Sequence, residues 1–214
     1  MRLVLPRLYV ILDAALLTIP ETECARQLVD AGVRLLQYRH KAALPRELLE
    51  SAKRLSAVFV RQRVTFIVND RPDIAALVGA SGVHVGQEDL GVEDARAVVG
   101  ADKLVGISTH NRAQFEQAAG TSADYIAVGP ISSTSTKTNP DPVIGTDFIR
   151  RVRPLTNKPI VAIGGITLDR AAEVVRAGAD SVAVISDILL AAEPSKRARQ
   201  FIETLEAVNR AAGV

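Results

Sequence analysis

Thr65-Phe-Ile-Val-Asn-Asp70 decides the fold class, because it is a short apolar run that ends in two polar residues. Its apolar residues follow one another instead of alternating with polar ones, which is typical of a strand buried on both faces of a parallel sheet. Seven further runs of this kind bring the predicted strands to eight. The predicted strands span residues 8–13, 35–41, 65–70, 82–86, 104–110, 125–131, 159–165 and 181–188.

The segments between these strands have the spacing of amphipathic helices, with apolar residues three and four positions apart. Ser195 is predicted to cap the last helix, since a serine side chain can accept a hydrogen bond from a backbone N–H of the first turn. Glycines stand at the predicted C-terminal ends of several helices, where a residue in the left-handed conformation commonly follows. These glycines are Gly32, Gly100, Gly120 and Gly178.

The strands start about 17 to 34 residues apart, which is the length of one βα unit. Eight such units with no linker or low-complexity segment predict the α/β class and a single (β/α)8 TIM barrel, one domain over residues 1–214. An open doubly wound sheet is the alternative, but it normally uses fewer strands and lacks this regularity.

The composition limits the partners and the compartment. The 26 Lys and Arg residues nearly balance the 24 Asp and Glu residues, so no broad basic field for nucleic acid is expected. No apolar stretch approaches the roughly 20 residues of a membrane span, and we expect no membrane contact. Cys24 is the single cysteine, which excludes an internal disulfide and fits a cytoplasmic location. The sequence leaves open whether the chain forms a homo-oligomer.

Charged residues collect where the predicted strands end, and (β/α)8 enzymes place their functional residues at that edge. Asp70 and Asp89 follow neighbouring strands, which lie about 4.8 Å apart, and one or two carboxylates typically hold Mg²⁺ together with water and phosphate oxygens. Arg39, Lys41 and Lys137 suit a diphosphate bound to that ion. The alternative is that both aspartates are helix N-caps, because each precedes a helical segment.

The loop after the seventh strand and the helix start after the eighth predict a phosphate site, and the loop after the sixth strand lies beside them in the chain order. Gly164 and Gly165 allow backbone N–H groups to approach an anion closely, although a tight turn would also need glycine. The Ser- and Thr-rich segment 132–140 is long for a βα connection and favours a loop that closes over ligands, with a solvated flexible loop as the alternative. His84 is predicted to be a hydrogen-bonded structural histidine and His110 a helix cap, so neither is placed in the catalytic set.

Seven motifs, in this order and at these strand ends, resemble the thiamine phosphate synthase family. They are Gln37-Tyr-Arg-His-Lys41, Asn69-Asp70, His84-Val-Gly-Gln-Glu-Asp89, Gly106-Ile-Ser-Thr-His110, Gly129-Pro-Ile followed by Thr134-Ser-Thr-Lys137, Gly164-Gly-Ile166 and Val184-Ile-Ser186. The resemblance implies a transferase of thiamine biosynthesis. Such an enzyme condenses 4-amino-2-methyl-5-(diphosphooxymethyl)pyrimidine with 4-methyl-5-(2-phosphooxyethyl)thiazole and releases pyrophosphate.

The resemblance also implies a role for each site residue. The pyrimidine diphosphate would be bound by Gln37, Tyr38, Arg39, His40, Lys41, Asn69, Ser108 and Lys137. The thiazole phosphate would be bound by Thr134, Ser135, Thr136, Gly165, Ile185 and Ser186. One Mg²⁺ per subunit would lie on Asp70 and Asp89, and the catalytic residues would be Arg39, Lys41, Lys137 and Ser108. Two positions depart from the pattern: Gly91 stands where a proline is common, and Tyr38 where an aliphatic residue is common.

Three other functions are weighed against this one. The related thiazole tautomerase has a histidine after the sixth strand, where this chain has Pro130. A sugar-phosphate isomerase or aldolase would need a glutamate or a Schiff-base lysine inside the barrel, and none is obvious. A non-catalytic phosphate-binding barrel would have no need to stabilise a leaving group, which is what Asp70, Asp89 and the three basic residues suit.

Overall fold

A computed structural model describes residues 3–133 and 141–211, whose backbone closes into a barrel of parallel strands. The strands are β1 (Leu8–Asp13), β2 (Leu35–Arg39), β3 (Thr65–Asn69), β4 (Gly82–Val85), β5 (Leu104–Thr109), β6 (Tyr125–Val128), β7 (Ile160–Ile163) and β8 (Ser181–Val184). Each strand pairs with the next along the chain, and β8 pairs with β1 to close the ring. The predicted α/β class and (β/α)8 barrel are therefore confirmed.

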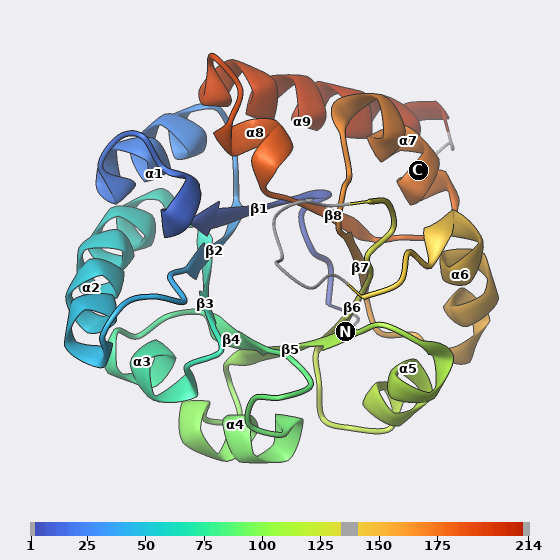
Figure 1. Cartoon of the computed structure of the whole chain (residues 1–214), viewed down its shortest axis with the longest axis horizontal. Coiled ribbons are helices and arrows are strands. Elements are labelled where there is room, and N and C mark those ends of the chain that lie inside the picture. Colours follow the sequence, from blue (N-terminus) through green and yellow to red (C-terminus); the bar gives the residue numbers. More distant parts are fainter. Residues whose placement is uncertain (1–2, 134–140, 212–214) are drawn as a thin grey trace.

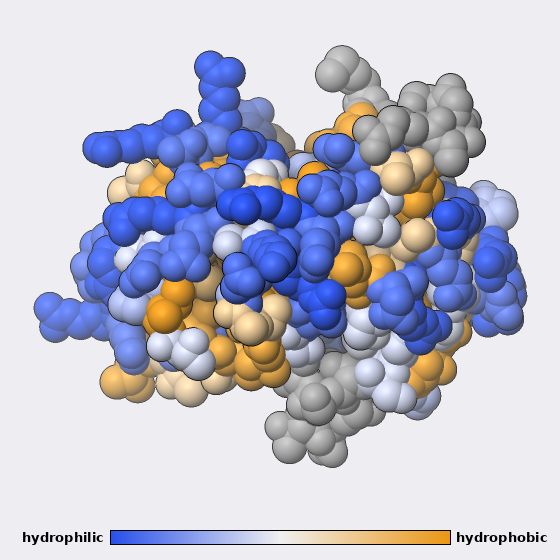
Figure 2. All heavy atoms as spheres, turned by 90° about the horizontal axis from the view of Figure 1, so that it is seen from above, coloured by the Kyte–Doolittle hydropathy of each residue, from blue (hydrophilic) through white to orange (hydrophobic). Residues whose placement is uncertain are grey.

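Helices surround the barrel on the outside, as Figure 1 shows in a view along its axis. They are α1 (Glu21–Asp30), α2 (Pro45–Gln62), α3 (Pro72–Leu77), α4 (Val92–Val99), α5 (Arg112–Ala119), α6 (Gly145–Val152), α7 (Leu168–Arg176), α8 (Ser186–Leu189) and α9 (Pro194–Ala211), with short 3-10 turns η1 (Ala14–Leu16) and η2 (Arg153–Leu155). Hydrophilic side chains cover most of the face seen in Figure 2, and the apolar patches on it are scattered. Among the helices that the structure describes, none is long and apolar enough to cross a membrane.

All predicted strands except the first extend beyond the observed C-terminal ends. The residues that follow these strands turn over the rim of the barrel, although the N–H of Asp70 still donates to the carbonyl of His84 at 2.7 Å. Asp70 adopts a left-handed conformation with φ 61°, and the backbone N–H of Gly86 donates to the Asp89 carboxylate at 2.7 Å instead of to a neighbouring strand. The seventh strand also starts one residue later than predicted, at Ile160, because Pro159 has no N–H for the ladder.

The observed helix ends agree in part with the ends that the sequence predicts. Gly32, Gly100 and Gly178 have positive φ angles of 104°, 94° and 113°, as predicted for the residue that ends a helix. The prediction for Gly120 is wrong, because α5 ends in a right-handed turn with φ −83° at this glycine. Ser195 is not an N-cap either: α9 already begins at Pro194, since proline suits the first helical turn, where its missing N–H has no helical partner.

Two apolar layers form the core. The larger lies between the sheet and the helices, and the smaller fills the inside of the barrel. The inner layer consists of Leu5, Tyr9, Ile11, Leu35, Ile67, Tyr125, Ala127, Val161 and Ala183. Because side chains alternate between the two faces of a strand, the positions that face inward can be followed up to the rim. On β2 these are Leu35, Gln37 and Arg39.

Gly106 on β5 leaves the space that the ring of Tyr125 occupies inside the barrel. A Cβ atom at position 106 would lie 2.0 Å from Cζ of Tyr125, which is fully buried. We expect Gly106→Ala to lower the free energy of unfolding by about 3 kcal/mol, since overpacking of a dense core forces its side chains to shift. Urea unfolding would measure this change. Gly120→Ala is the control, because its φ is ordinary and its Cβ would lie 3.5 Å from the nearest atom; equal losses in both variants would contradict the packing argument.

Candidate active site

Arg39 and Asp13 form an ion pair at the rim, where the ends of β2 and β1 lie side by side. Asp13 is almost completely buried and also accepts a hydrogen bond from the backbone N–H of Ala15 at 3.1 Å. A guanidinium has five N–H donors, so the pairing with Asp13 fixes Arg39 and leaves donors for an anion. The sequence identified Arg39 but not its partner Asp13.

Asp70, Asp89 and Lys41 lie together on the next part of the rim. Nζ of Lys41 is 3.0 Å from Oδ2 of Asp70. Burial raises the pKa of Asp89, and the nearby Asp70 raises it further, whereas the Gly86 N–H and Lys41 lower it. Two carboxylates that repel one another in this way are held close together, as the sequence predicted for residues of neighbouring strands.

Neither aspartate is a helix N-cap. Helix α3 is preceded by Arg71 and α4 by Gly91, and these residues occupy the N-cap positions. The alternative interpretation of Asp70 and Asp89 as caps is therefore wrong. Their carboxylates are left to bind groups at the rim, Asp70 next to Lys41 and Asp89 next to the N–H of Gly86.

Gln37, Asn69 and Ser108 extend the site into the mouth of the barrel. Gln37 is 2% exposed, and its amide nitrogen donates to the hydroxyl of Tyr9 at 2.8 Å. Asn69 is half-buried at the last position of β3, next to His84 of β4 in the strand register. Oγ of Ser108 lies 2.8 Å from Nε2 of His84. These three side chains offer neutral hydrogen-bonding groups below the charged rim.

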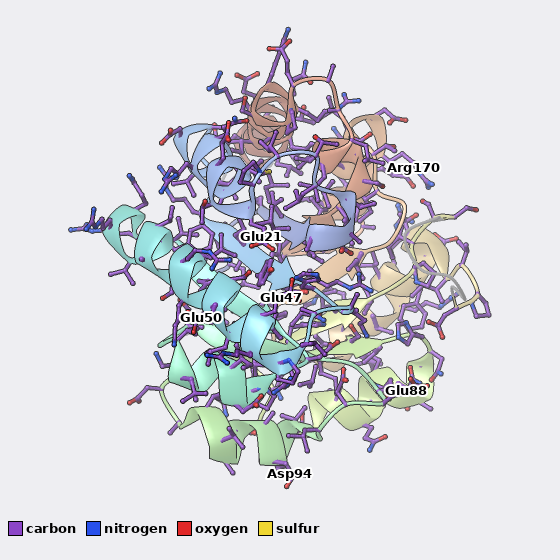
Figure 3. All side chains as sticks on the ribbon, turned by 60° about the vertical axis from the view of Figure 1, so that its left-hand side comes forward. Glu21, Glu47, Glu50, Glu88, Asp94 and Arg170 are labelled. Carbon is purple, nitrogen blue, oxygen red and sulfur yellow. The ribbon has the colours of Figure 1, made fainter. Side chains whose placement is uncertain are left out.

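Tyr38 and His40 do not lie in the mouth, although the resemblance places them in the pyrimidine site. Tyr38 belongs to the layer between sheet and helices and donates its hydroxyl hydrogen to Glu21. Figure 3 labels Glu21 where the start of α1 faces α2. The Nδ1 atom of His40 lies 3.1 Å from the Tyr38 hydroxyl and 3.8 Å from Glu21. We therefore leave both residues out of the site proposed below.

The two histidines near the mouth have different surroundings. His84 is buried and hydrogen-bonded through both ring nitrogens, to Tyr125 and to Ser108, which confirms the prediction of a structural histidine. His110 is not a helix cap, because Asn111 caps α5 by accepting from the N–H of Gln114. Instead Nδ1 of His110 donates to the carbonyl of Gly129 at 2.7 Å.

Gly164 and Gly165, with φ 94° and 62°, connect β7 to α7. A Cβ at position 165 would lie 2.2 Å from the carbonyl oxygen of Ser133, so the glycine is required for the close approach of two loops. Arg170 of α7 reaches the same loop and donates to the hydroxyl of Ser132; Figure 3 labels it on this helix. Arg170 is a cation of this region that no sequence motif indicated, although it stands only five residues after Gly165.

The last residues of the predicted phosphate site are Ile185 and Ser186, which come directly after β8, where α8 begins. Thr134, Ser135, Thr136 and Lys137 lie outside the described residues. Within the described ranges no three His, Cys, Asp or Glu side chains converge as a metal site. The pair Asp70 and Asp89 instead fits an ion that completes its coordination with water and with oxygens of a substrate.

This fold and rim define a (β/α)8-barrel enzyme for small-molecule substrates. The sequence model of the family described as thiamine monophosphate synthase matches residues 8–188. The chain belongs to this family, and it is a transferase of thiamine biosynthesis.

Relatives that match nearly the whole chain agree with this assignment. A thiamine-phosphate synthase of Koribacter versatilis is 50% identical over 208 residues, which cover 94% of this chain and 96% of that protein. A thiamine-phosphate synthase of Chloroflexus aurantiacus is 44% identical, with 91% and 90% covered. The solved structure of a thiamine phosphate pyrophosphorylase from Pyrococcus furiosus superposes with a TM-score of 0.86 at 33% identity, with 95% and 96% covered. The resemblance predicted from the seven motifs is confirmed.

Proposed function

We propose that the protein joins an aminopyrimidine that carries a diphosphate to a thiazole phosphate, giving thiamine phosphate and pyrophosphate. The observation that carries this proposal is the charged rim, in which Asp13 fixes Arg39 while Lys41 lies beside Asp70 and Asp89. A diphosphate needs several cationic groups at one place, and this rim supplies them at the end of the barrel where such enzymes bind substrates.

We propose that one Mg²⁺ per subunit is held by Asp70 and Asp89, in keeping with the Mg²⁺ assistance expected for this family. The residues fit the ion: the two carboxylates come from adjacent rim segments, and burial together with the nearby Asp70 raises the pKa of Asp89. A cation between the carboxylates would remove their repulsion. When bound, the ion would neutralise part of the charge on the diphosphate leaving group.

The side chains of the rim stabilise the charge that forms during the reaction. The bond between the pyrimidine methylene carbon and the diphosphate oxygen breaks, and its electron pair leaves with pyrophosphate. The lone pair of the thiazole nitrogen then forms the new C–N bond, and because this nitrogen carries no hydrogen, no general base is needed. Arg39 and Lys41 bind the leaving oxygens, and Gln37, Asn69 and Ser108 hold the pyrimidine and its diphosphate in place.

We assign the thiazole phosphate to Gly165, Ile185 and Ser186, together with Thr134, Ser135 and Thr136. Support comes from Gly164 and Gly165, which adopt left-handed conformations and have no side chains that would fill the turn. The nearby guanidinium of Arg170 adds positive charge to this end of the site. We also propose a cytoplasmic location, since Cys24 is a buried free thiol.

The test is to incubate the purified protein with both substrates and Mg²⁺ and to measure thiamine phosphate and pyrophosphate. We expect both products in equal amounts, and neither product when the thiazole phosphate is omitted. Pyrophosphate release without the thiazole partner would show hydrolysis, and conversion of a thiazole isomer without the pyrimidine would show the tautomerase instead.

Lys137→Ala should slow the chemical step more than it weakens binding of the thiazole phosphate, because the resemblance assigns Lys137 to the leaving diphosphate. We expect kcat to fall about 10²-fold, with little change in the KM for thiazole phosphate. Steady-state kinetics with each substrate varied in turn would measure both constants. A large rise in that KM at unchanged kcat would place Lys137 at the thiazole phosphate instead.

A further inference from the structure

A chain of five hydrogen-bonded side chains crosses the inside of the barrel directly below the rim. It runs from Gln37 to Tyr9, from Tyr9 to Tyr125, from Tyr125 to His84 and from His84 to Ser108. We call these residues the interior hydrogen-bond chain. Its two ends, Gln37 and Ser108, belong to the proposed pyrimidine diphosphate site, whereas its three central residues have no function in the reaction described above.

The central residues are fixed in place by packing. Tyr9, Tyr125 and His84 are at most 7% exposed. The ring of Tyr125 stacks on His84 with centroids 5.5 Å apart and meets Tyr9 edge to face at 6.2 Å. The absence of a side chain at Gly106 makes room for Tyr125, so the hydroxyl groups have little freedom to choose other partners.

The donor and acceptor roles along the chain follow from its first contact. The amide nitrogen of Gln37 can only donate, so the oxygen of Tyr9 accepts, at 2.8 Å. Among the described residues, Tyr125 at 3.1 Å is the acceptor that remains for the hydrogen of Tyr9, and Nδ1 of His84, also at 3.1 Å, is then the acceptor for the hydrogen of Tyr125. Because Nδ1 accepts this hydrogen, the ring of His84 carries its one hydrogen on Nε2. Nε2 therefore donates to Oγ of Ser108.

Both ends of the chain consequently present a defined group to the mouth. The amide oxygen of Gln37 accepts no hydrogen bond from the described residues, and no buried polar side-chain atom among them lacks a partner, so this oxygen must reach solvent. Oγ of Ser108 accepts from His84, which leaves its own hydrogen for another acceptor. Gln37 thus offers an acceptor and Ser108 a donor.

We propose that Tyr9, Tyr125 and His84 are positioning residues that hold the Gln37 oxygen and the Ser108 hydroxyl hydrogen toward the mouth, and that they thereby select a pyrimidine with an amino group. This inference rests on the proposed function. The amino group of the pyrimidine donates to the oxygen of Gln37, while the Ser108 hydroxyl donates to an anionic oxygen of the diphosphate. A pyrimidine with an oxo group in place of the amino group would meet oxygen against oxygen, and a site that leaves polar groups unpaired discriminates strongly.

The hydrogen position on His84 can be read without any substrate. A two-bond ¹H–¹⁵N correlation spectrum of the full-length protein, with the His84 signals assigned by their loss in His84→Gln, reports which ring nitrogen is protonated. We expect the Nε2–H tautomer of a neutral ring at pH 7. A hydrogen on Nδ1 would reverse the bonds that His84 makes with Tyr125 and with Ser108 and would overturn the proposal. This measurement does not depend on activity. A failure of the proposed function, seen in the product assay, can therefore be distinguished from a failure of this inference.

The selectivity is tested with Tyr9→Phe. This substitution removes the acceptor of the Gln37 amide nitrogen and lets the amide group rotate, so that its nitrogen and oxygen can exchange places. We expect the ratio of kcat/KM for the amino substrate to that for its oxo analogue to fall at least tenfold. Thr109→Val is the matched control. Thr109 directly follows Ser108, and its buried hydroxyl donates to the carbonyl of Ala127, outside the interior hydrogen-bond chain. We expect Thr109→Val to keep the wild-type ratio, even if both variants lose similar thermal stability. A folded Tyr9→Phe protein with an unchanged ratio would also overturn the proposal.

Discussion

Asp70→Asn and Asp89→Asn should each lower the Mg²⁺-dependent rate of thiamine phosphate formation about 10²- to 10³-fold while the fold persists. An amide keeps the shape of the carboxylate but loses the negative charge that binds the ion. The amide oxygen introduced at position 89 can still accept from the N–H of Gly86, and asparagine tolerates the left-handed conformation that Asp70 adopts. Initial rates over a series of Mg²⁺ concentrations would show both a lower maximum and a higher half-saturating concentration.

Asp94→Asn is the control for the loss of one negative charge. Asp94 lies in the first turn of α4 and is exposed, and Figure 3 labels it at the outer edge of the molecule. We expect the rate of this variant to stay close to that of the wild type, and the melting temperatures of all three variants to change little. Wild-type rates in both Asp70→Asn and Asp89→Asn would falsify the metal assignment.

The sequence predicted the barrel because strands buried on both faces carry continuous apolar runs. Because these runs are continuous, they do not show which face of its strand each residue occupies. Gln37 and Arg39 face the inside of the barrel, whereas Tyr38 between them faces the helices and pairs with Glu21. A resemblance based on a contiguous motif places all three in one site, but the two-residue period of a strand separates Tyr38 from its neighbours.

Contacts between side chains from distant parts of the chain could not be predicted from the sequence. Asp13 is the last residue of the first predicted strand, but its pairing with Arg39 depends on the register between β1 and β2. The contact of Tyr9 with Tyr125 joins residues 116 positions apart. By contrast, Asp70 and Asp89 were found because adjacent parallel strands bring their ends to the same edge.

Arg39→Met should lower both stability and rate, and a second substitution separates the two effects. The methionine removes the partner of Asp13, whose side chain is only 2% exposed, and leaves a charge buried with one backbone N–H. Loss of one member of such a pair costs about 3–5 kcal/mol of unfolding free energy. The rate should fall about 10²- to 10³-fold, because the leaving diphosphate loses a guanidinium. Urea unfolding and kcat would measure the two changes.

The double variant Asp13→Asn/Arg39→Met removes the unpaired charge while an amide oxygen remains to accept from Ala15. We expect it to regain most of the lost stability, because an uncharged amide is much less costly to bury than an isolated carboxylate. Its rate should stay as low as that of Arg39→Met, since the guanidinium is still missing. If the rate recovered together with the stability, Arg39 would act only by holding β1 to β2, and the leaving group would have to be stabilised by other cations of the site.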